Sequence, residues 1–123
     1  MDAVEMLRRQ REARSKWHEL DEPPRRALLV RRPAATAMLQ FASGISASQV
    51  PALVGAAVVD WRGFTEADLL GGTLGSSDAM QPYDAAVFQE WVDDSPEAMN
   101  AIALAVVDLV QANTERQARA AKN

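Results

Sequence analysis

The chain has 123 residues and a formal net charge of −4, with no cysteine and a single histidine. That length suits one domain with a modest core, and the lack of cysteine excludes disulfide scaffolds, zinc fingers, iron–sulfur clusters and thiol catalysis. Hydrophobic residues make up 48% of the chain, but 23 of them are alanine, which favours helices that pack closely through small side chains.

The charges divide the chain into a basic front and an acidic body. Residues 1–33 carry nine Lys and Arg against six Asp and Glu, whereas residues 34–123 carry four against eleven. The overall acidity argues against nucleic-acid binding by the whole surface, although not by the basic front. No apolar run approaches the roughly 20 residues of a membrane span, and the charged N-terminus is not a secretory signal. We therefore expect an intracellular protein that does not bind membranes.

The first predicted element is a helix over residues 3–20. Asp2 suits its N-cap, and Glu5 stands three residues later, as in a capping box. Apolar positions are sparse in this segment, so the helix can bury only a thin stripe. We expect it to dock weakly, to project from the rest, or to be ordered by a partner. Pro23 and Pro24 cannot donate helical hydrogen bonds and end it.

Short elements are predicted through the middle of the chain, because apolar stretches alternate there with prolines, glycines and capping residues. They are an extended segment or short strand at 27–30, a short helix at 34–42, a helix from Ser46 or Ser48 with Pro51 in its first turn to about Val59, a chain turn at 61–64 and a capped turn at 65–68.

A loop and two helices are predicted for the last third of the chain. Residues 71–77 are rich in Gly and Ser and lack the lysine of a phosphate loop, so we expect a surface loop. A helix follows at 83–93. Ser95-Pro96-Glu97 is a strong helix start, and the final helix is predicted to run to about Ala120. Its length of roughly 37 Å would make it the scaffold of the domain.

Together these elements predict an all-α fold, a small bundle of four to five helices with a long C-terminal helix and a short extended segment near 27–30. We divide the chain into a basic N-terminal helix, residues 1–22, which can project, and a single helical domain, residues 23–123.

No group of residues indicates an enzyme. His18 has no identifiable partner, no serine lies in a nucleophile-elbow pattern, and no pair of carboxylates stands out for acid–base catalysis. The acidic residues around Asp93 and Asp94 are explained by the helix N-terminus that follows them. We therefore predict a non-enzymatic protein that needs no metal or cofactor.

Partner binding is expected of the basic front and of some aromatic residues. The arginines can meet phosphates or an acidic protein surface, including the acidic body of another copy, and the interleaved acids make nucleic acid the weaker alternative. Most aromatics between residues 61 and 91 are expected in the core, whereas a partly exposed tryptophan would mark a contact surface. The candidate partner-binding residues are Arg8, Arg11, Arg14, Trp17, Arg25, Arg26, Trp61 and Phe64.

Several short motifs follow one another as in a known family. The run Val58-Val59-Asp60-Trp61-Arg62-Gly63-Phe64 resembles the Val-x-x-Trp-x-Gly-type turn that ends a helix in the small tail assembly chaperones of long, non-contractile-tailed phages. A Gly-rich loop, the Pro82-Tyr83 step, the Asp94-Ser95-Pro96 helix start and a final helix ending in Lys122-Asn123 come next. The resemblance covers roughly residues 34–123.

The resemblance implies a chaperone that binds the tape-measure protein, keeps its long hydrophobic helices in solution and helps to recruit tail-tube subunits. It places the protein in the cytoplasm of the infected or lysogenic host bacterium and outside the mature virion. We also expect self-association. Two alternatives stay open: a structural virion component, such as a minor tail or head–tail completion protein, and a nucleic-acid-binding regulator that uses residues 8–32.

Overall fold

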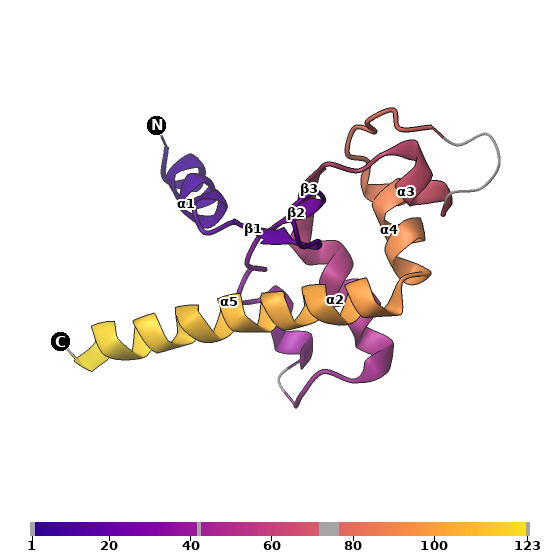
Figure 1. The fold of residues 1–123 in the computed structure, drawn as a ribbon. Coiled ribbons are helices and arrows are strands. Elements are labelled where there is room, and N and C mark those ends of the chain that lie inside the picture. Colours follow the sequence, from indigo (N-terminus) through magenta and orange to yellow (C-terminus); the bar gives the residue numbers. More distant parts are fainter. Residues whose placement is uncertain (1, 42, 72–76, 123) are drawn as a thin grey trace.

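The fold combines a small antiparallel sheet with helices. The computed structural model describes residues 2–41, 43–71 and 77–122, and for residues 11 and 12 the backbone alone. In chain order the elements are α1 (Ala3–Glu12), β1 (Lys16–Glu19), β2 (Ala27–Val30), the 3-10 helices η1 (Ala37–Phe41) and η2 (Ala47–Gln49), α2 (Val50–Ala57), β3 (Val58–Arg62), α3 (Glu66–Leu70), α4 (Ala85–Asp93) and α5 (Pro96–Lys122). Figure 1 shows the strands on one side of α5, α3 and α4 near the start of α5, and α1 standing apart beyond the strands.

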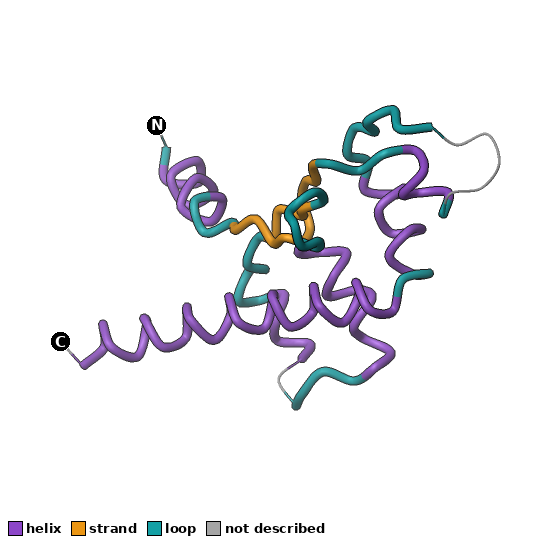
Figure 2. Tube along the Cα trace, in the orientation of Figure 1, coloured by secondary structure: helices purple, strands orange, loops and turns teal. Residues whose placement is uncertain are grey.

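The prediction of an all-α bundle is wrong, because three segments pair as strands (Figure 2). The helix predicted over 3–20 ends at Glu12, and residues 16–19 form β1. The helix predicted to reach Val59 ends at Ala57, and the first two residues of the chain turn predicted at 61–64 belong to the strand β3. Each segment is short, so its hydrophobic pattern alone did not distinguish the two kinds of structure.

The central strand β2 explains why its neighbours are extended. Ala27, Leu28 and Val30 are at most 1% exposed, which confirms the predicted strand at 27–30. A buried backbone must form hydrogen bonds along both edges. β1 supplies them on one side, with Trp17 opposite Leu29, and β3 on the other, with Trp61 opposite Leu28. Both pairings are antiparallel.

The core lies between the sheet and the helices α2 and α5. Val58 follows the last residue of α2 in an extended conformation and is the first residue of β3, so helix and strand are directly joined within the core. On α5, Ile102 and Val106 are fully buried one helical turn apart. The predicted long final helix is confirmed from Pro96 onward. Buried side chains of this core are Leu28, Val30, Leu53, Val54, Ala57, Val58, Met99, Ile102 and Val106.

Two further predictions are confirmed by the structure, and a third falls mostly outside the described residues. The capped turn at 65–68 is confirmed as the start of α3, where the Thr65 hydroxyl accepts the Asp68 N–H. The helix at 83–93 is confirmed as α4, which begins at Ala85 because Asp84 Oδ1 accepts the N–H groups of the first turn. Of the loop predicted at 71–77, residues 72–76 lie outside the described residues.

Both ends of the chain extend beyond the core. The side chains of residues 114–122 on α5 and of residues 2–10 are all exposed. Arg14 Nη1 donates to Asn113 Oδ1 at 3.0 Å, so the segment before β1 is tied to the outer half of α5. Within the described ranges no helix has both the length and the apolar character to cross a membrane.

Gly63, directly after β3, allows the chain to pass close to β2. Its φ is +77°, and a Cβ there would overlap the Arg25 carbonyl oxygen, whereas Gly71 has a φ of +66° with open space around it. We expect Gly63→Ala to lower the free energy of unfolding by about 3 kcal/mol and Gly71→Ala by about 1 kcal/mol, because only the first adds steric overlap to left-handed strain. Urea unfolding followed by circular dichroism measures both, and equal losses would contradict the close approach.

Candidate functional site

An open apolar groove lies between the edge strand β1 and the middle of α5. We call it the β1–α5 groove, and its volume is about 560 Å³. Alanines at 101, 105 and 112 form its small-residue stretch on α5, and Leu104 beside them is 67% exposed. Ala101 lies three residues before Leu104 and four before Ala105, and Ala105 lies seven before Ala112, so the four share one side of the helix. The lining residues are Lys16, Trp17, His18, Val30, Ala101, Leu104, Ala105, Asp108, Leu109 and Ala112.

On the strand side of the groove, Trp17 is held by a cation. Arg62 Cζ lies 4.4 Å from the centroid of the Trp17 ring, and Arg62 Nη2 donates to Glu19 Oε1 at 2.7 Å. Such a cation–π contact stabilises by about 0.5–1 kcal/mol at an exposed site. The contact therefore favours one orientation of the indole before any partner arrives.

The sheet register explains how Arg62 reaches β1. Glu19 lies opposite Ala27, and Ala27 lies opposite Arg62, so the three side chains form one row across the sheet. The methyl group of Ala27 is short enough for the long Arg62 side chain to pass over the middle strand. A larger residue at this position would occupy that path.

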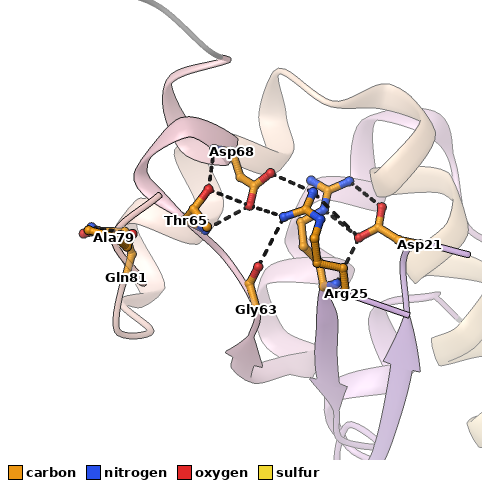
Figure 3. A network of polar contacts seen from close by, with 8 residues as sticks. Asp21, Arg25, Gly63, Thr65, Asp68, Ala79 and Gln81 are labelled. Carbon is orange, nitrogen blue, oxygen red and sulfur yellow. Dashed lines mark hydrogen bonds and ion pairs between the residues drawn. The ribbon is translucent and has the colours of Figure 1, made fainter. Parts of the chain in front are cut away.

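Arg25 and Arg26 bind two different carboxylates of their own chain (Figure 3). Arg25 Nη1 and Nη2 donate to Asp68 Oδ2 and Oδ1 at 2.7 and 2.9 Å. Arg26 Nε and Nη2 donate to Asp21 Oδ2 and Oδ1 at 2.9 and 3.0 Å. The Arg26–Asp21 pair lies within the connection between β1 and β2, and the Arg25–Asp68 pair joins this connection to α3.

The Arg25 contact stabilises the charged form of Asp68. The Arg25 guanidinium, together with hydrogen bonds from Thr65, lowers the pKa of Asp68 to about 2 against the opposing effect of partial burial. The hydrogen bond from Arg26 likewise lowers the pKa of Asp21. Both carboxylates are therefore ionised at neutral pH, and the guanidinium groups have local counterions.

Trp61 and Phe64 belong to an aromatic cluster in the core. Their rings stack at 4.5 Å between centroids, and Phe64 contacts Trp91 edge-on at 5.0 Å. Trp61 Nε1 donates to the Gln81 carbonyl at 2.8 Å, which satisfies its only donor. The expectation that most aromatics between 61 and 91 lie in the core is thus confirmed for this pair, which is 5% and 1% exposed.

The eight candidate partner-binding residues do not form one site. Arg8 is exposed on α1, the Arg11 side chain lies outside the described residues, and Arg14 is bound to α5. Among the candidates whose side chains the structure describes, Trp17 alone lines the β1–α5 groove. Leu104 was missed. The sequence feature that could have indicated it is a large apolar residue that does not follow the spacing of the buried residues of the final helix.

Comparison with protein-family models, with curated proteins and with solved structures gives no match to this chain. The resemblance to tail assembly chaperones therefore stays a prediction. In the portion of the chain that the structure describes, no group of three or more histidine, aspartate or glutamate side chains is placed to hold a metal ion.

The Arg25–Asp68 pair makes stability depend on pH. Because the Asp68 pKa falls from 3.8 to about 2 on folding, its contribution is complete above pH 3.8 and is lost as the pH falls toward 2. We expect Asp68→Asn to lower the free energy of unfolding by about 2 kcal/mol at pH 7 and by little at pH 2. Urea unfolding across this range measures the difference. The exposed Glu22→Gln serves as control, and a loss from Asp68→Asn that does not change with pH would contradict the ion-pair explanation.

Proposed function

We propose that this protein is a non-enzymatic tail assembly chaperone of a long, non-contractile-tailed phage. It binds an apolar helical stripe of the tape-measure protein in the β1–α5 groove and helps to recruit tail-tube subunits in the host cytoplasm, and it is absent from the mature virion. The order of motifs from Val58 to Asn123 supports the family. The placement of the binding site in the β1–α5 groove is supported by the exposed apolar face of α5 beside Trp17, whose ring contacts Arg62.

The shape and chemistry of the groove suit an amphipathic helix. Helix-in-groove recognition uses apolar residues spaced three and four apart, laid against a complementary apolar surface. The alanines of α5 let a partner helix approach closely, while Leu104 and Trp17 supply the area that gains most from burial, at roughly 25 cal/mol per Å². A tryptophan ordered in advance binds at low entropic cost and is a typical hot spot.

The charges favour a protein partner over nucleic acid. Arg25 and Arg26, two cations of the basic front, are paired with Asp68 and Asp21, so fewer guanidinium groups remain for phosphates. The acidic body, with eleven Asp and Glu against four Lys and Arg in residues 34–123, gives a like-charged surface. Such a surface helps to keep a complex with a hydrophobic partner in solution.

Co-expression with the tape-measure gene product tests the proposal. We expect the soluble fraction of the tape-measure protein to rise with this chain, and to fall at least fivefold when Leu104→Asp places a charge in the groove. Leu39→Asp is the matched control, since Leu39 is 70% exposed on η1 and outside the groove. Equal solubility with and without the chain, or equal effects of the two variants, would contradict the proposal.

The protein composition of the virion distinguishes a chaperone from a structural component. We expect mass spectrometry of purified virions to find no stoichiometric peptide signal from this chain, because a chaperone leaves the finished tail. A signal proportional to that of the tail-tube protein would overturn the chaperone role and favour a minor tail or head–tail completion protein.

A further inference from the structure

The helix α1 carries an apolar face that its own chain leaves open. Val4, Met6 and Leu7 are 67%, 53% and 62% exposed. α1 has ten residues, fewer than the about 12–15 at which an isolated helix becomes even marginally stable in water. A helix this short with this much exposed apolar surface gains stability when another surface covers it.

The open apolar face of α1 lies in the first half of the helix and is bordered by positive charge. Ala3 and Leu7 are four residues apart, and Val4 and Leu7 three, so their side chains share one side of the helix. Arg8 follows Val4 by one turn and borders that side. The whole front, residues 1–33, has three more basic than acidic residues.

A second groove, between α3 and α4, has the complementary character. We call it the α3–α4 groove, and its volume is about 770 Å³. Leu70 and Val87 line it and are 50% and 40% exposed. Glu66, Glu90 and Asp94 also line it, and no Lys or Arg is among its described lining residues. It is an apolar groove with an acidic border.

We propose that α1 of one copy of this chain docks into the α3–α4 groove of a second copy. The apolar face of α1 covers Leu70 and Val87, and Arg8 meets the acidic border of the groove. This pairing removes two exposed apolar surfaces from water at once, and it brings opposite charges together.

The hydrogen bond that holds the segment after α1 to α5 favours docking of α1 into the groove of another copy. Arg14 is bound to Asn113, which lies 18 residues along α5 from Ser95 at the α3–α4 groove, or about 27 Å. α1 itself is about 15 Å long and ends at Glu12, two residues before Arg14. Figure 1 shows the strands between α1 and α3–α4. While this bond holds, the C-terminal end of α1 stays near Asn113, and the strands separate α1 from the groove of its own chain.

Each contact joins two different surfaces. Two copies that exchange α1 reciprocally close into an isologous dimer with two such contacts, whereas exchange without closure is heterologous and continues into larger assemblies. This association uses neither Trp17 nor Leu104. It therefore stands apart from the β1–α5 groove and from the proposed chaperone function.

Cysteine cross-linking between two full-length variants tests the pairing directly, because the natural chain has no cysteine. Leu7→Cys and Val87→Cys chains are mixed at micromolar concentration and oxidised. We expect a disulfide-linked species containing one chain of each kind. The control replaces Val87→Cys by Leu39→Cys, an exposed leucine on η1, and should give at least tenfold less product.

Two results would overturn the proposal. The first is equal or no cross-linking in the two mixtures. The second is a link within a single chain of the double variant, because α1 would then occupy its own groove. Far-ultraviolet circular dichroism of each variant confirms that it is folded.

Charge exchange gives an independent measurement. In sedimentation equilibrium, Arg8→Glu and Glu90→Arg should each weaken self-association at least fivefold, and a mixture of the two variants should recover part of the loss, since each then meets an opposite charge. A chain that is monomeric at all tested concentrations, or a mixture no stronger than its components, would contradict docking of α1 in this groove.

Discussion

The buried strand β2 needs hydrogen-bond partners along both edges, and the rest of the fold follows from that need. A buried N–H or C=O left unpaired costs about 1–3 kcal/mol, more than the helical preference of any one residue in the flanking segments. β1 and β3 are therefore extended although neither is strongly apolar. Their pairing places Trp17 at one edge of the sheet and brings Val58, directly after α2, into the core.

The same strand links the fold to the candidate site. Ala27 of β2 is small, so Arg62 on β3 reaches across it to Glu19 and to the Trp17 ring on β1. A contact between the two outer strands thus positions the tryptophan that lines the β1–α5 groove. The segment directly before β2 approaches Gly63 so closely that only glycine fits there. The groove and the core therefore both depend on the pairing register of the three-stranded sheet.

Much of the helical structure could be predicted from the sequence, because caps and prolines act locally. The start of α5 at Pro96, the Thr65 cap of α3 and the end of α4 before Ser95 are of this kind. The strands β1 (Lys16–Glu19) and β3 (Val58–Arg62) could not be predicted, since they are extended only because β2 lies between them. The groove escaped prediction for the same reason: Trp17 and Leu104 are 87 positions apart and meet through tertiary structure. The arginines 25 and 26 were expected to meet a partner, but their carboxylates lie in the same chain.

The most direct measurement of the central claim is hydrogen–deuterium exchange of the full chain with and without the tape-measure protein. We expect binding to slow amide exchange in residues 16–19 and 101–112, the two sides of the β1–α5 groove, and to leave exchange in α3 and α4 unchanged. Slowed exchange confined to α3 and α4, or no change anywhere, would contradict the assignment of the β1–α5 groove as the partner-binding site.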